Sequence, residues 1–391
     1  MTDYSILPAL VDERLSGGRV RIDLDALKSN WKKLAGMTPT SKTAAVVKAD
    51  GYGLGVEQVV SALTEAGCET FFVALPEEGV RVKKQAPSAQ VFVLEGLFKN
   101  AVATYAEADL TPVLGSIENI ELWASFWHER GSRRPCAIHV DTGMNRLGLR
   151  VEEAKEFVLD DSRRNSVTPI LVMSHPACSD ELNHPKNAEQ VAAFNEVRSL
   201  FPGVDASFAN SAGIIGHKDF IFDLSRPGIA LYGGEAIENF ANPMKPVVTL
   251  EGRIIQIRRA SAGETIGYAA THTFTRETKI ALVAVGYADG YLRSNSGFDM
   301  RTKGTAPAKG PVGYLCGREV PIIGRVSMDI TALDVTDIPE QELEKAEWVE
   351  LFGNNIALDD AARAAGTIGY ELLTGLGARY SRTYISSDKR D

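Results

Sequence analysis

The chain has 391 residues, of which 44% are hydrophobic, 24% charged and 8% aromatic. This is the composition of a globular protein, and it excludes collagen-like, disordered and small disulfide-stapled classes. The net charge of −9 comes without any block of Lys and Arg, so nucleic acid and anionic membranes are poor candidates as partners.

The cysteines and the N-terminus together predict a cytoplasmic protein. The four cysteines are scattered and form no CxxC pair, which is typical of reduced thiols. No basic region precedes an apolar stretch at the N-terminus, so no secretory signal is predicted. No apolar run approaches the ~18 residues that a membrane span needs.

From about Arg19 to residue 245, short β-rich runs alternate with helical ones. The predicted strands are residues 19–24, 43–50, 70–75, 89–96, 111–115, 136–143, 169–177, 205–213 and 229–234. The clearest helical patterns between them are residues 25–35, 56–67, 76–85, 117–130 and 189–200. This alternation predicts an α/β fold, and its size fits a (β/α)₈ TIM-like barrel, with an open doubly wound sheet as the competing arrangement.

After about residue 245 the pattern becomes β-rich with Gly, Pro, Asp and Asn between the runs, and only residues 357–366 form a good helical pattern. This predicts a separate, mainly antiparallel β-domain. We therefore assign residues 1–245 to the barrel domain, with its core from about residue 19, and residues 246–391 to the C-terminal β-domain.

Lys48 is the most unusual candidate residue, because it ends the apolar run 44–47 immediately before a glycine-rich turn. Active sites of (β/α)₈ barrels lie at the carboxyl ends of the strands. A partly desolvated lysine favours its neutral amine and can act as a nucleophile. The competing interpretation is a solvated lysine at a strand end. The sequence contains no GxGxxG or Walker fingerprint, so nucleotide binding is not supported.

Other predicted strand ends carry polar residues that a core does not need, and together they outline a cationic pocket with a seat for phosphate. These residues are Asp141, Thr142, Arg146, His175, Asn210, Ser211, Arg226 and Gly228. His175, Cys178 and His184 lack a second compact ligand pair, so no metal site is predicted. In the β-domain, tyrosine follows glycine repeatedly, at Tyr268, Tyr287 and Tyr370. Such tyrosines are either packing residues or suppliers of hydroxyl groups to the pocket.

These motifs resemble the alanine racemase family of pyridoxal-phosphate (PLP) enzymes of fold-type III. The resemblance runs from residue 19 to the end, through VVKADGYGLG, DTGMNRLG, ANSA, RPGIALYG, GYADG and GRVSMD in the family's order. It implies a barrel followed by a β-domain, PLP as cofactor, alanine as substrate, and a homodimer in which each β-domain completes the partner's active site.

The resemblance also implies a role for each matching residue. Lys48 binds PLP covalently, and Arg226 faces its pyridine nitrogen. Arg146 contacts the cofactor's phenolic oxygen and the substrate carboxylate. The phosphate is held by Tyr52, Ser211, Tyr370 and the backbone around Gly228 and Ile229, and His175 and Asn210 are further cofactor-binding residues.

The remaining roles concern the substrate, and they imply a two-base racemisation. Lys48 and Tyr268 stand on opposite faces of the substrate Cα, and His175 supports Tyr268. Met328 contacts the substrate, and Tyr287 lines the entrance. The product serves either peptidoglycan synthesis or alanine catabolism, because both use the same reaction.

Two positions depart from the family pattern. His139 stands where many members carry a carbamylated lysine that pairs with the arginine matching Arg146, and Ser207 replaces a histidine before the Asn-Ser motif. Three alternatives remain open at this point. They are a broad-specificity amino-acid racemase, a fold-type III decarboxylase, and a non-catalytic PLP-binding protein, which would lack the β-domain.

Overall fold

The computed structural model describes residues 11–296 and 310–387, and the chain divides into two compact units. The barrel unit is Leu27–Lys245. The C-terminal unit combines the described residues up to Ala26 with those from Pro246 onward. Within the described ranges, no helix is long and apolar enough to cross a membrane.

Parallel strands form the barrel unit, in the spatial order β10-β9-β7-β6-β5-β4-β3. Their bounds are β3 Ala45–Val46, β4 Thr70–Val73, β5 Gln90–Val93, β6 Thr111–Leu114, β7 Pro135–Asp141, β9 Thr168–Met173 and β10 Asp205–Ser207, with the short β8 Leu149–Arg150 beside β7. The strands are almost continuously apolar, and Phe71, Phe72 and Val73 of β4 are fully buried. Such runs are typical of parallel strands that are covered on both faces.

The two ends of this sheet are joined through β11 (Leu224–Ser225), which pairs in parallel with β2 (Lys42–Thr43). Because β2 leads directly into β3, this pairing brings the chain after β10 back to the first strand. The Arg226 backbone N–H also donates to the Ala209 carbonyl oxygen at 2.9 Å, just beyond β10. The predicted (β/α)₈ TIM-like barrel is confirmed.

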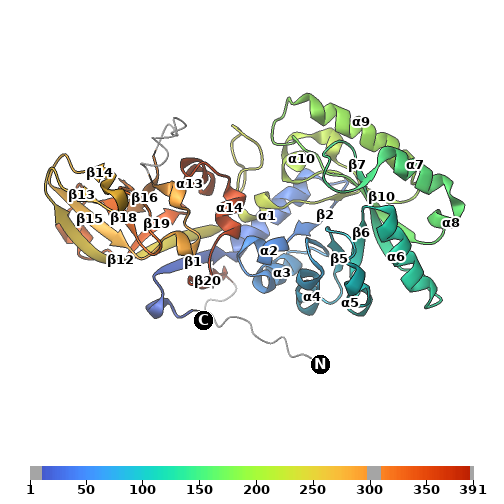
Figure 1. The fold of residues 1–391 in the computed structure, drawn as a ribbon, viewed down its shortest axis with the longest axis horizontal. Helices are drawn as coiled ribbons and strands as arrows, with labels where there is room; N and C mark the ends of the chain where they lie inside the picture. The colour runs from blue at the N-terminus through green and yellow to red at the C-terminus, as the bar shows by residue number, and fades with distance from the viewer. Residues whose placement is uncertain (1–10, 297–309, 388–391) are drawn as a thin grey trace. The chain divides into compact units, whose positions relative to one another are not determined.

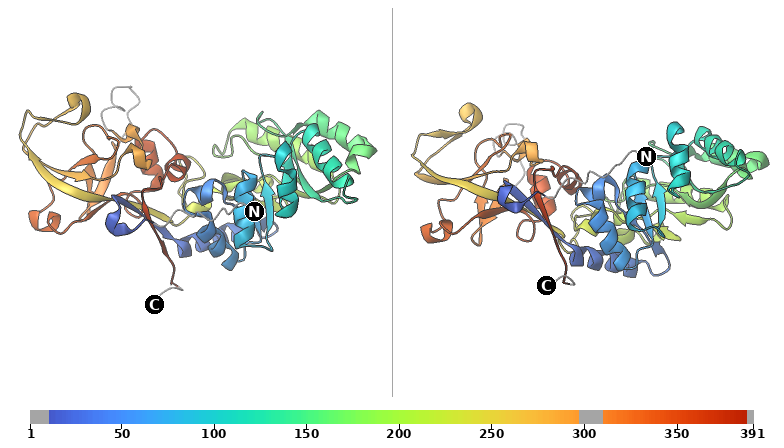
Figure 2. Two further views of the ribbon diagram at one scale, coloured as in Figure 1. Left: turned by 60° about the horizontal axis from the view of Figure 1, so that its bottom comes forward. Right: turned by 90° about the horizontal axis from the view of Figure 1, so that it is seen from below.

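Helices follow the strands and cover their outer side, as Figures 1 and 2 show for α3 to α6. Their bounds are α1 Leu24–Met37, α2 Lys48–Tyr52, α3 Val56–Glu65, α4 Pro76–Gln85, α5 Val102–Glu107, α6 Ile117–His128, α7 Val151–Leu159, α8 Asp161–Arg164, α9 Pro185–Ser199 and α10 Ser211–Gly216. Helix α6 shows why these segments are helical. Ser116 caps it by accepting from the Asn119 N–H, and Ile120, Trp123 and Trp127 recur on its buried face.

The last predicted barrel strand is wrong. Residues 229–234 were expected to be extended, but Ile229–Tyr232 form a 3₁₀ helix that ends at Gly233, which has φ of +85°. The last strand is instead β11, four residues earlier. The apolar character of this segment reflects full burial of Ile229, Ala230 and Leu231 rather than strand geometry.

The C-terminal unit is a mainly antiparallel sheet, as the sequence predicted, with the spatial order β17-β16-β19-β12-β1-β20; β15 also pairs with β12, and β18 pairs with β15. Its strands are β1 Gly18–Asp23, β12 Val248–Ala260, β13 Thr265–Ile266, β14 His272–Thr273, β15 Thr278–Val283, β16 Val312–Leu315, β17 Arg318–Pro321, β18 Thr331–Asp334, β19 Trp348–Phe352 and β20 Ser381–Ile385. Its helices include α12 Glu340–Leu343, α13 Leu358–Ala364 and α14 Gly369–Thr374, so α13 matches the predicted helical pattern and the other two were not predicted.

The first strand belongs to this unit and not to the barrel. Strand β1 pairs antiparallel with β12, through Arg19↔Glu251, and parallel with β20, through Arg19↔Ser381. This corrects the sequence assignment, which placed residues 19–23 at the start of the barrel. Arg19 strengthens the placement, because its Nε donates to Glu251 at 2.7 Å and its guanidinium stacks 4.3 Å from the Trp348 ring centre.

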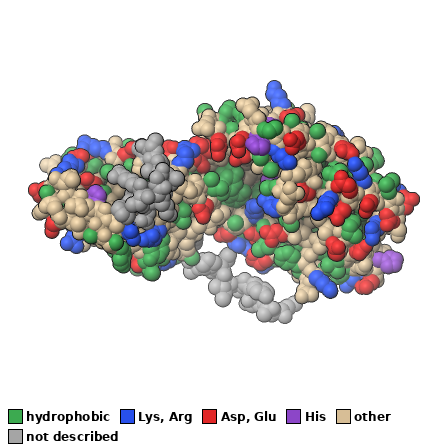
Figure 3. Space-filling view, turned by 45° about the horizontal axis from the view of Figure 1, so that its top comes forward, with side chains coloured by type: hydrophobic (Ala, Val, Ile, Leu, Met, Phe, Trp, Pro, Cys, Tyr) green, Lys and Arg blue, Asp and Glu red, His purple; other side chains and the backbone are tan. Residues whose placement is uncertain are grey.

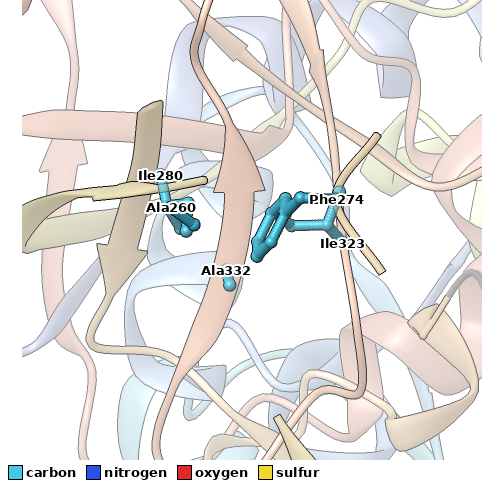
Figure 4. Close-up of a cluster of buried hydrophobic side chains, with 5 residues drawn as sticks. All are labelled: Ala260, Phe274, Ile280, Ile323 and Ala332. Atoms are coloured by element: carbon cyan, nitrogen blue, oxygen red, sulfur yellow. The ribbon is translucent and has the colours of Figure 1, made fainter. Parts of the chain in front are cut away.

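Figure 4 shows a small cluster of buried apolar side chains in the C-terminal unit. It consists of the buried residues Ala260, Phe274, Ile280, Ile323 and Ala332. Phe274 follows β14 directly, and its backbone also closes the loop by bonds to Gly263 and Glu264. Ile266 of β13 packs against the cluster, so the hairpin that carries Tyr268 is anchored to it.

We expect Phe274→Ala to lower the free energy of unfolding of the C-terminal unit by about 3–5 kcal/mol, because the lost ring leaves a cavity. Phe274→Leu, which keeps most of the apolar volume, should cost only about 1 kcal/mol. Urea unfolding of each variant, followed by the fluorescence of Trp348 in the C-terminal unit, measures both free-energy costs. Equal costs for the two variants would show that the ring does not support the unit.

Candidate active site

Lys48 follows β3, at the carboxyl end of the barrel strands where the sequence placed it. The next four residues do not continue into a right-handed helix. Ala49, Asp50, Gly51 and Tyr52 have φ of 54°, 57°, 63° and 56°, which is the left-handed region. A left-handed turn therefore begins at Lys48 and ends at Tyr52, so the strand and the turn together fix both side chains.

The Lys48 amine lies in a surrounding that favours its neutral form. Burial lowers the pKa of Lys48, and the nearby Arg146 guanidinium lowers it further. The carboxylates of Glu78 and Glu95 act in the opposite direction but do not cancel these effects. A neutral amine is the form that attacks a carbonyl carbon or accepts a proton.

Arg226 is a buried cation held by neutral groups. Its Nη1 donates to Ser207 Oγ, and its Nη2 donates to the Ser174 carbonyl oxygen at 2.7 Å and more weakly to that of Phe208. Burial lowers its pKa to about 9, so it stays protonated at neutral pH. Among the described residues, none of its hydrogen-bond partners is an anion. The barrel therefore contains a positive charge that can be matched by a ligand.

Ser211 and Gly228 form a compact polar seat at the end of β11. The Ser211 hydroxyl accepts from the backbone N–H groups of Gly228 at 2.9 Å and Ala230 at 3.3 Å. A Cβ built on Gly228 would lie 2.4 Å from Tyr52 Oη, so only glycine allows the tyrosine hydroxyl to approach this backbone. A hydroxyl, a second hydroxyl and backbone N–H groups together suit the oxygens of a phosphate.

Asn210 supports this seat through hydrogen bonds to neighbouring residues. Its Oδ1 accepts from the Gly213 N–H at 2.9 Å and so caps α10, while its Nδ2 donates to Ser179 Oγ at 2.9 Å. Asn210 thus holds Ser211 in place, and it is a supporting residue rather than one with a free amide group.

Tyr52 is positioned by a second tyrosine. Its ring stacks on that of Tyr232, with ring centres 4.5 Å apart, and Tyr232 Oη donates to the Val46 carbonyl oxygen at 2.9 Å. Because Val46 belongs to β3, these contacts connect the polar seat at Ser211 and Gly228 to the strand that precedes Lys48.

Two histidines near the cations remain neutral. Burial holds the pKa of His175 well below its usual range, and the charges of Arg226 and Arg146 lower it further. Burial and Arg226 lower the pKa of His139 to about 4. At neutral pH both rings therefore add hydrogen-bonding capacity to the site and no charge.

Gln190 of α9 holds the loops on which His175 and Thr142 lie. It is completely buried; its Nε2 donates to the His175 carbonyl oxygen at 3.1 Å and its Oε1 accepts from the Ala177 N–H at 2.8 Å. The Thr142 and Ser174 hydroxyls are 2.9 Å apart, which joins this brace to the carbonyl oxygen that Arg226 uses. No motif in the sequence indicated Gln190.

Arg146 lies on an exposed loop, and within the described structure its guanidinium makes no hydrogen bond or ion pair with another residue. The neutral His139 cannot replace the anion that a carbamylated lysine provides. At the second departure, the Ser207 hydroxyl accepts a hydrogen bond directly from Arg226 Nη1.

On the face shown in Figure 3, acidic and basic side chains of the barrel unit are intermingled. The net charge of −9 therefore does not describe the site, which contains the guanidinium groups of Arg146 and Arg226 beside Lys48.

The other predicted site residues lie in the C-terminal unit and are exposed there. The exposed fractions of the side chains are 70% for Tyr268, 54% for Met328, 42% for Tyr287 and 39% for Tyr370. Tyr268 follows β13, and Tyr370 lies in the first turn of α14 rather than in a β-turn. Large exposed apolar side chains of this kind are typical of surfaces that meet another molecule.

The loops of Tyr287 and Met328 are fastened to each other. The Tyr287 N–H donates to the Ser327 carbonyl oxygen at 3.0 Å, and the Ala288 N–H donates to that of Met328 at 2.9 Å. A Cβ on Gly286 would lie 2.4 Å from both carbonyl oxygens, so glycine is required for this approach.

Arg379 links the same two loops through its guanidinium. It donates from Nε and Nη2 to the buried Asp289 carboxylate at 2.6 and 2.8 Å, and from Nη1 to Asp329 at 2.9 Å. Asp289 and Asp329 belong to the motifs GYADG and GRVSMD, but neither motif indicates that they share an arginine. Nothing in the local pattern pairs them with Arg379, which lies 50 or more positions away.

The comparisons with known proteins agree over almost the whole chain. The family model for the alanine racemase N-terminal domain matches residues 22–236, and that for the alanine racemase C-terminal domain matches residues 247–384. An alanine racemase of Rhizobium meliloti is 47% identical over 370 residues, which are 95% of this chain and 97% of the relative. A biosynthetic alanine racemase of Agrobacterium fabrum is 47% identical, over 95% of this chain and 94% of the relative.

Among solved structures, an alanine racemase from Bartonella henselae with covalently bound pyridoxal phosphate matches with a TM-score of 0.87 at 35% identity. The match covers 95% of this chain and 100% of that chain.

The neutral His139 makes stability depend on pH. Its pKa is about 4 in the folded chain and near 6.5 when unfolded, so the unfolded state binds a proton first as the pH falls. The contribution of His139 to stability is complete above pH 6.5 and is lost progressively between pH 6.5 and about 4. We expect His139→Gln to remove about 3 kcal/mol of this pH dependence.

Denaturant unfolding at several pH values in that window measures the effect. The unaltered chain, measured in parallel at each pH, is the control. An unchanged slope in His139→Gln would contradict a neutral buried imidazole.

Proposed function

This chain belongs to the alanine racemase family, and we propose that Lys48 and Tyr268 are the two groups that exchange the α-proton of its substrate. The protein is a PLP-dependent isomerase that interconverts L-alanine and D-alanine. The observation that carries our assignment is the lowered pKa of Lys48, whose amine lies at the carboxyl end of a barrel strand. The same barrel contains the buried Arg226, which has no anionic partner among the described residues.

The residues of the barrel unit fit PLP. Lys48 offers the amine for its aldehyde, and Arg226 offers N–H donors for its ring nitrogen. Ser211, Tyr52 and the backbone of Gly228 and Ile229 form the polar seat for its phosphate, supported by Asn210. Tyr370, in the C-terminal unit, is a further proposed phosphate ligand. When bound, PLP supplies an electron-withdrawing ring that stabilises negative charge at the substrate Cα.

Arg226 decides which reactions the site favours. Its guanidinium is protonated at neutral pH, so it donates to a ring nitrogen without transferring a proton. A ring nitrogen that stays unprotonated withdraws electrons less strongly, which disfavours decarboxylation and transamination. A carboxylate at this position would act in the opposite way.

The two proposed bases come from different units of the chain. Lys48 accepts or returns the proton on one face of Cα, and the partner's Tyr268 does so on the other face. By the family analogy, Lys48 handles the proton of D-alanine and Tyr268 that of L-alanine. His175 belongs to the hydrogen-bonding groups that support Tyr268.

We propose a homodimer in which the C-terminal unit of each copy completes the site of the other. The exposure of Tyr268, Met328 and Tyr287 supports this, because these large side chains are only partly covered by their own unit, and the loops of Tyr287 and Met328 are bonded to each other. Arg146 binds the substrate carboxylate, Met328 contacts the substrate and Tyr287 lines the entrance. The cytoplasmic location also remains a prediction.

We predict that the purified protein is yellow and that borohydride reduction fixes the cofactor to Lys48. Neutral-amine chemistry at this position is favoured by burial and by Arg146. Peptide mass mapping after reduction measures the site of attachment, and Lys28 and Lys33 serve as internal controls. A colourless protein, or cofactor on another lysine, would refute the assignment.

Tyr268→Phe should lower L-to-D turnover by about 10²- to 10⁴-fold, because it removes a proton-transfer group. The visible spectrum of the bound cofactor should stay unchanged, since Lys48 is intact. Chiral analysis of alanine measures turnover in each direction. Tyr314→Phe, a partly buried tyrosine in β16, is the matched control and should retain activity. Full activity in Tyr268→Phe would rule out the two-base assignment.

A further inference from the structure

The turn after Lys48 has an unfavourable conformation that its surroundings must maintain. Ala49, Asp50 and Tyr52 are not glycines, and yet all three lie in the left-handed region. Left-handed backbone is sterically costly for residues with a Cβ, and consecutive residues of this kind are rare. The position of Lys48 therefore depends on whatever holds Ala49 and Asp50.

Helix α4 provides that hold through Glu78. One carboxylate oxygen, Oε1, accepts from the Ala49 N–H at 2.6 Å. The other, Oε2, accepts from the N–H groups of Ala74 at 2.8 Å and Leu75 at 3.0 Å. Glu78 is only 8% exposed, so three short bonds satisfy a carboxylate that is almost completely buried.

Arg81, on the same face of α4 three residues later, holds the next residue of the turn. Its Nη2 donates to Asp50 Oδ1 at 2.7 Å, and its Nε and Nη2 donate to Glu57. Asp50 Oδ1 also accepts from the Val56 N–H at 3.1 Å. The turn is thus fixed from one side by two residues of a single helix.

We propose that Glu78 is a positioning residue for Lys48: its carboxylate holds the Ala49 N–H, keeps the left-handed turn closed and so aims the Lys48 amine. This inference rests on the proposed function, because it takes Lys48 as the residue that PLP modifies. Glu78 touches neither cofactor nor substrate in this role and acts only through Lys48.

The competing interpretation is a helix cap. Glu78 is the third residue of α4, and its bond to the Leu75 N–H is an ordinary capping interaction. The bond to Ala49 is different, because Ala49 lies outside α4 and next to Lys48. A cap alone would affect stability, whereas a positioning residue also affects the reactivity of one amine.

The charge of Glu78 provides a second measurable effect, a change in the pKa of Lys48. The charged groups that act on Lys48 are Arg146, which lowers its pKa, and Glu78 and Glu95, which raise it; His175 is nearby but neutral. Removing the Glu78 charge should therefore move the ionisation of Lys48 to lower pH. Replacing Glu78 by Asp should retain the charge but shorten the reach to Ala49.

The experiment measures how fast the full-length chain, freed of its cofactor, reacts with added PLP. The Lys48 amine adds to the aldehyde carbon of the added PLP; a C=N bond replaces the C=O bond, and the aldehyde oxygen leaves as water with the two amine hydrogens. Absorbance follows the rate across pH, which gives a plateau at high pH and a midpoint at which the amine loses its proton. In Glu78→Gln we expect the plateau to fall at least about tenfold and the midpoint to move to lower pH.

Three further variants complete the test. Glu78→Asp should restore the midpoint but not the plateau. Glu77→Gln, an exposed neighbour on α4, should match the unaltered chain. Ala49→Gly combined with Glu78→Gln should recover part of the plateau, because glycine adopts the left-handed region without steric cost. If Glu78→Gln does not fold, this double variant and Glu78→Asp decide the matter.

A lower melting temperature with unchanged plateau and midpoint would overturn the proposal and leave Glu78 as a helix cap. The failure of the proposed function looks different. In that case borohydride would not fix PLP to Lys48 even in the unaltered chain, whatever the Glu78 variants do.

Discussion

The site depends on one electrostatic constraint, which is a buried guanidinium held only by neutral acceptors among the described residues. Arg226 bonds a serine hydroxyl and two backbone carbonyl oxygens, and burial lowers its pKa to about 9. This positive charge helps to keep His139 and His175 neutral, and Arg146 helps to lower the pKa of Lys48. A negatively charged, ring-containing cofactor suits such a surrounding, and the protein's overall negative charge gives no sign of it.

The second constraint is mechanical. A lysine can be aimed only if the backbone on both sides is fixed, and the backbone after Lys48 lies in a conformation that most residues avoid. The barrel fixes one side through β3, and α4 fixes the other through Glu78 and Arg81. In the C-terminal unit, a single residue likewise fixes two loops, because Arg379 bonds both Asp289 in the loop of Tyr287 and Asp329 in the loop of Met328.

Sequence patterns predicted those features that arise from neighbouring residues. The alternation of strands and helices indicated the barrel, because each βα unit is written in one continuous stretch. Lys48 was found because an apolar run ends there before glycines. The assignment of residues 19–23 to the barrel was wrong for the complementary reason: β1 pairs with β12 and β20, which lie hundreds of positions away. Gln190 and Glu78 were missed because their acceptors and donors are on other elements.

The sequence by itself determined the fold class, the cationic residue types and the motif order that identifies the family, since these are properties of local composition and spacing. Only the tertiary structure decided which unit the first strand joins, and which side chains hold Lys48 and Arg226 in place. Those choices depend on hydrogen bonds and burial between distant segments. These interactions form only when the chain folds and brings the segments together, so a local sequence pattern cannot indicate them.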